Sequence, residues 1–156
     1  MMLRTGLTAA GLVLAGVVLV AGGRAEPAHT SHLCSAQDKQ FIRAAALSTT
    51  ALTLLGQDYQ AGTLSAKQAI AQTRNAELGI RNTDPRDPTL KLARSLMGGM
   101  MVEYARAVRA QWKGTDDAGS HMFRSYSLAN YGHEVLVDAE PTLDALGCSV
   151  AGLLQE

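Results

Sequence analysis

An uncharged run, Leu7 to Ala21, decides the compartment in which the rest of this chain folds. A basic residue precedes the run, and Gly23 and Ala25 place small residues at the minus-three and minus-one positions of a cleavage site. This order of features is typical of a secretory signal peptide. We therefore expect residues 1–25 to be removed and the mature protein to begin at Glu26, secreted or held in the periplasm or cell envelope.

An uncleaved membrane anchor is the alternative interpretation of the same run. A membrane-spanning helix needs about 20 strongly apolar residues, and glycines dilute this shorter stretch. In the tethered form, residues 7–23 would hold the protein to the membrane. Otherwise we expect contact with a membrane only during export.

Two cysteines, Cys34 and Cys148, stand near the two ends of the mature chain. An even number of cysteines in an oxidising compartment predicts a disulfide. The bond would close a loop of more than about a hundred residues, worth about 4–5 kcal/mol in the chain-entropy model.

The mature chain, about 130 residues long, has the size of one ordinary domain. We expect a polar lead-in at 26–34 and a single domain at 35–156. Without the leader the chain keeps 12 basic and 14 acidic residues, a net charge of −2. This balance gives no strong field for nucleic acid or an anionic membrane, so we expect no nucleic-acid partner.

Composition and periodicity predict an all-α fold. The chain is rich in Ala, Leu, Gln, Met and Arg and poor in the β-branched and aromatic residues that strands favour. We expect an up-and-down bundle of four main helices plus a short C-terminal helix, with its ends tied by the disulfide.

Capping signals place the first helices. Ser35 with Asp38 and Ser65 with Gln68 have the capping-box spacing, so two helices should begin there. The first helix should end between Gly56 and Gly62. Its wide apolar stripe predicts that neighbours cover it on two sides.

Prolines place the later helices. The third helix should run from Pro88 to about Trp112. A fourth should end near Asp138, and a last short helix should start at Glu140 and Pro141. Gly98 and Gly99 lie inside the third helix, where each costs about 1 kcal/mol against alanine, so we expect close packing, a kink or a ligand there.

Sulfur and imidazole side chains suggest one ligand site. It would hold copper or haem through Met97, Met100, Met101 and His121, with His133 as a further ligand. Methionines at helical spacing also serve as gap-filling core, and we favour that interpretation. No cofactor is therefore our first expectation.

A second candidate is a polar pocket between helices. His133 and Glu134 sit late in the fourth helix, and Tyr104 on the third helix could face them. Such a pocket would make the protein an enzyme, but no local carboxylate orients the imidazole. We identify no catalytic residue.

Several enzyme classes lack their motifs in this chain. The sequence has no G-x-S-x-G, no P-loop and no H-E-x-x-H. The paired Glu-x-x-His of di-iron bundles is also missing. We therefore expect a non-enzymatic binding or interaction module with an unknown protein or small-molecule partner. A soft-metal or haem protein is the alternative, and an enzyme the third.

Overall fold

The first two helices begin at reciprocal caps. At the start of α1 (Ala36–Gln60), Ser35 Oγ accepts a hydrogen bond from the Asp38 N–H at 3.1 Å, and Asp38 Oδ2 accepts one from the Ser35 N–H at 3.0 Å. Ser65 and Gln68 repeat the arrangement at the start of α2 (Ala66–Arg81). Both predicted helix starts are confirmed.

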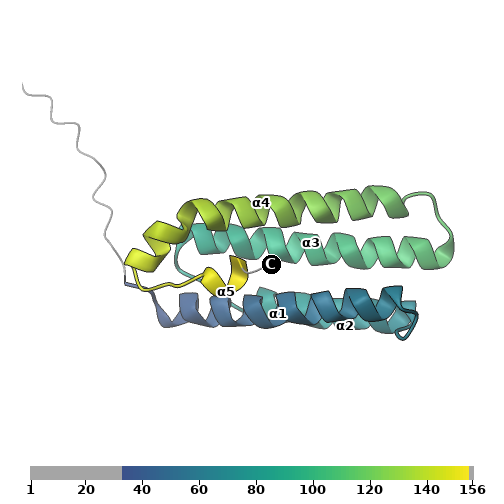
Figure 1. Ribbon diagram of the computed structural model, residues 1–156, viewed down its shortest axis with the longest axis horizontal. Coiled ribbons are helices and arrows are strands. Elements are labelled where there is room, and N and C mark those ends of the chain that lie inside the picture. Colours follow the sequence, from purple (N-terminus) through teal and green to yellow (C-terminus); the bar gives the residue numbers. More distant parts are fainter. Residues whose placement is uncertain (1–32, 155–156) are drawn as a thin grey trace, which may run out of the picture. The chain divides into compact units, whose positions relative to one another are not determined.

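The computed structural model describes residues 33–154, and they form five helices. After α1 and α2 come α3 (Pro88–Lys113), α4 (Ala118–Ala145) and the single turn α5 (Ala151–Leu154). The four long helices run up and down (Figure 1), which confirms the predicted fold class. Among these residues, no helix combines the length and apolar character of a membrane span. The predicted signal peptide lies outside the described residues.

The third helix matches its prediction to within one residue. Asp87 caps it by accepting hydrogen bonds from the N–H groups of Thr89 and Leu90, and Pro88 occupies the first turn. Gly114 ends the helix with φ at 69°, a left-handed conformation that glycine adopts without strain.

The first helix ends at Gln60, between Gly56 and Gly62 as predicted. The predicted end of the fourth helix is wrong. The fourth does not stop near Asp138: it continues through Pro141 to Ala145, and the last helix begins only at Ala151. Leu143, which is 1% exposed, belongs to the main core. Its packing holds the last turns of α4 despite the N–H that proline lacks, and α4 turns towards α5 there (Figure 1).

The prediction that α1 is covered on two sides is also wrong. Leu47 is 73% exposed, and Leu54 lies on the same outer side of the helix and is exposed too. The sequence pattern does not distinguish a helix wedged between neighbours from one whose second apolar stripe faces water.

The core is divided into two clusters of buried side chains. The larger one lies towards the disulfide and draws on α1, α2, α3, α4 and the segment before α5. The smaller one lies between α1, α2 and α3 and contains Leu55, Ala69, Ile70 and Val108. No residue of α4 belongs to this smaller cluster, so α4 is held less closely to α1 at that end.

The disulfide between Cys34 and Cys148 is present, with 5.1 Å between the two Cα atoms. The Cys34 N–H also donates to the Leu146 carbonyl at 2.8 Å. The start of α1 is thereby fastened to the segment between α4 and α5. Such a bond indicates a non-reducing, extracytoplasmic setting.

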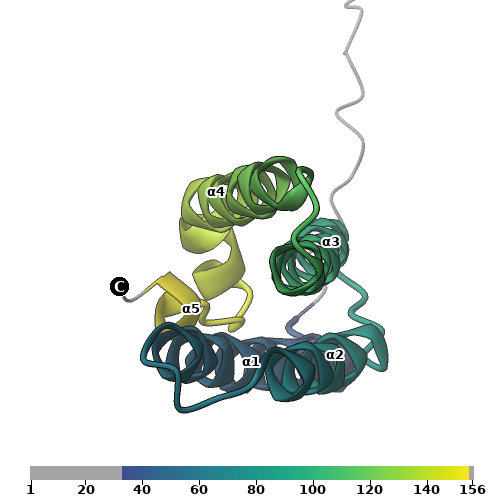
Figure 2. The same cartoon turned by 90° about the vertical axis from the view of Figure 1, so that its right-hand side faces the viewer.

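The helices α1 and α4 are not neighbours. Their Cα atoms nowhere come within 8 Å of each other, whereas α1 packs on α2, α2 on α3, and α3 on α4. Viewed along the helices, only α5 lies between α1 and α4 (Figure 2). One side of the four-helix arrangement is therefore open.

Candidate functional site

The open side forms a groove whose first wall is one face of α1. The α1 residues in this wall recur at three- and four-residue steps: Thr49, Leu52, Thr53, Gly56, Gln57 and Gln60. The helix α4 does not pack against this face, because its Cα atoms nowhere come within 8 Å of α1. The hydroxyls of Thr49 and Thr53 donate to carbonyls one turn back in their own helix.

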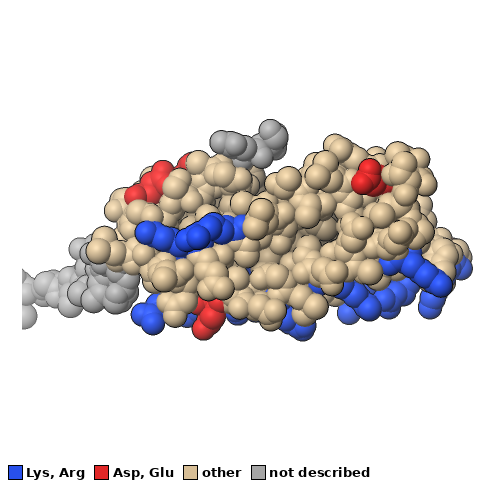
Figure 3. All heavy atoms as spheres, turned by 90° about the horizontal axis from the view of Figure 1, so that it is seen from below, with Lys and Arg blue, Asp and Glu red and all other residues tan. Residues whose placement is uncertain are grey.

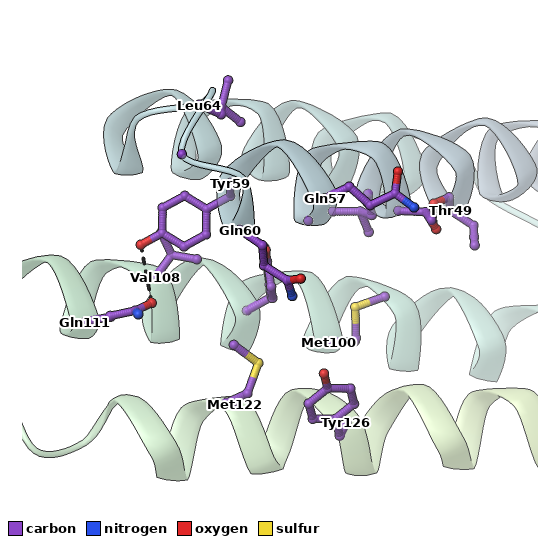
Figure 4. Close-up of a pocket in the computed structure, with 15 residues that line it drawn as sticks. Thr49, Gln57, Tyr59, Gln60, Leu64, Met100, Val108, Gln111, Met122 and Tyr126 are labelled. Atoms are coloured by element: carbon purple, nitrogen blue, oxygen red, sulfur yellow. Dashed lines mark hydrogen bonds between the residues drawn. The ribbon is translucent and has the colours of Figure 1, made fainter.

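The floor of the groove is α3 and its second wall is α4. Met100, Tyr104, Val108 and Gln111 come from α3, and Met122 and Tyr126 come from α4. In the close-up, Met122 and Tyr126 point from α4 towards α3 and α1 (Figure 4). The Tyr59 hydroxyl of α1 donates to Gln111 Oε1 of α3 at 3.3 Å and ties these helices together beside the groove (Figure 4).

The groove has a volume of about 940 Å³, and its lining is uncharged. None of the 15 lining residues is Lys, Arg, His, Asp or Glu. Aliphatic, thioether and aromatic surfaces alternate with amide and phenol groups. A lining that is largely apolar, with a few polar groups, is the usual composition of a small-molecule site.

Tyr104 lines the groove from α3. Burial, with smaller contributions from Tyr59 and Tyr126, raises the pKa of its phenol above the ordinary value of 10.0. The phenol therefore stays protonated at neutral pH. Its hydroxyl has no hydrogen-bond partner within residues 33–154, so it offers a free O–H donor to anything in the groove.

The residues predicted to bind copper or haem lie in different surroundings. Met101 is fully buried in the main core, Met97 packs against that core, and Met100 lines the groove. His133 is exposed on α4, about 18 Å along the helix from His121. The described structure does not bring these side chains together.

The predicted polar pocket is likewise dispersed. Tyr104 faces the groove, whereas His133 and Glu134 are exposed and do not line it. The predicted close packing is found at Gly99, where an added Cβ would lie 3.3 Å from Leu128 Cδ1. Beside Gly98 no atom lies within 4 Å, so that glycine is not a close-packing position.

His121 belongs to an ionic cluster that joins α3 to α4. Its Nδ1 lies 2.7 Å from Glu103 Oε2, and its Nε2 lies 3.3 Å from Asp117 Oδ2. Glu103 also pairs with Arg106 and Arg124. The His121 hydrogen bond, supported by the two guanidinium groups, lowers the pKa of Glu103 to about 2. Both ring nitrogens of His121 are occupied, and the cluster acts as a clamp between helices.

One group of potential metal ligands lies within the part of the chain that the structure describes: Cys34, Asp38 and Cys148. The two sulfurs are bonded to each other, and Asp38 accepts hydrogen bonds from backbone and hydroxyl donors. These three residues form a structural junction.

Most of the groove-lining residues were not predicted from the sequence, although one signal for them exists. Residues 44–57 contain no charged side chain and no histidine, although this segment belongs to a helix with a large exposed surface. A surface helix normally carries charges opposite its apolar face. The uncharged polar stripe containing Thr49, Thr53 and Gln57 could have indicated a binding face.

No family model, curated protein or solved structure matches this chain. The geometry of the groove and the compartment that the disulfide indicates are therefore the observations that bear on function.

Proposed function

We propose that this protein is an exported binding module that holds an uncharged, elongated, amphipathic small molecule in the groove between α1 and α4. The observation that carries the proposal is the separation of α1 from α4, which leaves a cavity of about 940 Å³ with a wholly uncharged lining. That volume suits a ligand of ordinary small-molecule size.

The chemistry of the lining supports this ligand class. A charged ligand would lose its hydration in the groove without gaining a partner of opposite charge, which is costly. An apolar chain would pack against the side chains of Leu52, Met100, Val108 and Met122. A hydroxyl, carbonyl or ether oxygen would find the free Tyr104 O–H.

The same lining favours binding over acid–base catalysis. Catalytic acids and bases work best with pKa values near the operating pH. The titratable groups of the groove are tyrosines, and the pKa of Tyr104 is raised further from neutrality.

Export is part of the proposal. It is supported by the uncharged run at residues 7–21 and by the disulfide. Terminal sequencing of protein recovered outside the cytoplasm should find a chain that begins near Glu26. A chain that still begins at Met1 in the membrane fraction would instead support the tethered form.

The binding proposal is tested by blocking the groove. An uncharged amphipathic fluorophore, N-phenyl-1-naphthylamine, should brighten with wild-type protein. In Gly56→Leu the new side chain enters the groove, since the nearest atom to an added Cβ is the Tyr104 hydroxyl at 3.9 Å. Affinity should fall about tenfold or more, a loss of at least about 1.4 kcal/mol.

Gly98→Leu is the matched control. It makes the same substitution inside a long helix but lies outside the groove, with open space around it. It should leave binding unchanged. Equal binding by the two variants, or no binding by the wild type, would reject the groove as the site.

A further inference from the structure

A second surface, on the outer side of α2 and α3, carries most of the basic residues of these helices. Lys67, Arg74 and Arg81 recur every seven residues along α2, so they form one stripe with a spacing of two helical turns. Lys91, Arg109 and Lys113 lie on the outer side of α3. These six residues define the basic face. In Figure 3, Lys and Arg side chains form a row along the lower edge of the view, with few acidic groups between them.

The acidic residues of α2 and α3 leave this charge largely uncompensated. Glu77 pairs with Arg81 at 3.5 Å, and Glu103 is engaged in the clamp to α4. Asp87 is occupied in capping α3. Lys67, Arg74, Lys91, Arg109 and Lys113 have no ion-pair partner within residues 33–154.

A separate group of acidic residues lies on the later part of α4. Residues 125–154 contain four acidic side chains, Glu134, Asp138, Glu140 and Asp144, and no Lys or Arg. The small net charge of the chain is therefore an average over the basic face and an acidic stretch on α4. Net charge alone, from which we expect no strong field for an anionic membrane, does not describe this distribution.

Exposed apolar side chains are interspersed with the cations. Trp112 is 53% exposed, and the Lys67 ammonium lies 5.5 Å from the centre of its ring. Leu78 and Val102 are exposed on the same two helices. A tryptophan beside lysine and arginine is typical of groups that sit at a lipid headgroup layer, because the ring enters the interface while the cations remain at the anionic headgroups.

We infer that the basic face docks the protein on the surface of an anionic lipid bilayer. The cations supply attraction to the headgroups, and Trp112 supplies shallow apolar insertion. A soluble polyanion would reward the charges but not the exposed ring, so the combination favours lipid. The groove lies on a different side of the helices, between α1 and α4, and stays open in this orientation.

Trp112 makes the test direct, because it is the only tryptophan of the chain. The processed protein is mixed with vesicles of phosphatidylglycerol and phosphatidylcholine, and with vesicles of phosphatidylcholine alone. We expect co-sedimentation with the anionic vesicles and a blue shift of the Trp112 emission. Binding should weaken when salt is raised from about 0.1 M to about 1 M, where the Debye length shortens from about 10 Å to about 3 Å.

Matched charge removal locates the surface. Arg74→Gln with Lys113→Gln removes two positive charges from the basic face, and vesicle affinity should fall about 30-fold. Lys39→Gln with Arg43→Gln removes the same charge from exposed positions on α1 and should cause much less loss. Because these residues are exposed and make no ion pair within residues 33–154, both double variants should keep the wild-type midpoint of urea unfolding.

Several results would overturn the inference. They are absence of binding to anionic vesicles, equal binding to neutral vesicles, equal loss in the two double variants, and binding without any change in Trp112 emission. Competition by heparin with no vesicle binding would identify a soluble polyanion as the partner and would likewise reject the lipid assignment. The fluorophore assay on the same variants keeps the groove proposal separate, since neither double variant alters the groove.

Discussion

Asp38 joins two parts of the chain that are far apart in sequence. Its Oδ2 accepts hydrogen bonds from the Ser35 N–H and hydroxyl, and its Oδ1 accepts from the backbone N–H groups of Arg86 at 2.6 Å and Asp87 at 3.0 Å. Burial raises the pKa of Asp38, but the hydrogen bond from Ser35 and the backbone N–H groups outweigh it and lower the pKa below 3.8. This buried carboxylate fixes the turn between α2 and α3 against the start of α1.

Removing that carboxylate should be costly. Asp38→Ala leaves buried donors without an acceptor, so we expect the free energy of unfolding to fall by about 3 kcal/mol. Urea unfolding followed by circular dichroism measures the loss. Asp138→Ala, at an exposed position on α4, is the control and should change stability by less than about 0.5 kcal/mol. Similar losses in both variants would contradict the role assigned to Asp38.

Glu103 predicts a pH dependence of stability. Its pKa is about 2 in the folded chain against an ordinary value of 4.5, so the unfolded chain binds the proton more readily. Its contribution is present above pH 4.5 and is lost as the pH falls towards 2. Glu103→Gln should flatten the unfolding free energy across this window. An unchanged acid profile would show that the clamp with His121, Arg106 and Arg124 does not couple to folding.

The sequence reveals only half of the Asp38 junction. The capping-box spacing identifies its bonds to Ser35, because they span three residues. The bonds to Arg86 and Asp87 span 48 and 49 residues, and no local pattern encodes them. The clamp around Glu103 has the same limit, since it depends on how α3 and α4 are aligned.

At the scale of elements, caps and prolines predicted the helix starts well, and the helix ends less well. Pro141 looked like the start of a new helix, yet the burial of Leu143 extends α4 past it. Helical periodicity also shows which face is apolar but not which neighbour covers it. The groove exists because α4 packs on α3 and not on α1. The apolar pattern of α4 is compatible with either neighbour, so the sequence does not predict which one it contacts.

The packing of α4 on α3 depends on small residues at the contact. Gly132 is buried, and an added Cβ would lie 3.6 Å from Leu96 Cβ. Gly132→Leu should therefore overpack the seam and lower the free energy of unfolding by about 2 kcal/mol. Gly98→Leu, which meets no neighbour, should instead gain up to about 1 kcal/mol from helix propensity. Thermal unfolding compares the two, and a Gly132→Leu protein as stable as Gly98→Leu would show a looser seam than the structure indicates.

At the scale of the whole molecule, the disulfide and the groove occupy opposite ends. The bond joins the start of α1 to the segment after α4, where the larger core cluster lies. The groove is lined by the later half of α1, by α3 from Met100 onward and by the first turns of α4. The sequence predicted the bond from two cysteines and the compartment. It could not predict the groove, which arises from the absence of contact between two helices.

This separation predicts that stability and binding respond differently to loss of the disulfide. Cys34→Ala with Cys148→Ala frees a span of 114 residues in the unfolded chain, so the free energy of unfolding should fall by about 4–5 kcal/mol. Urea unfolding of the double variant and of reduced wild-type protein should agree. Where the variant is still folded, N-phenyl-1-naphthylamine should bind with wild-type affinity, because no groove residue touches the bond. A folded variant that has lost binding would show that the disulfide at one end of the molecule sets the spacing of α1 and α4 at the groove.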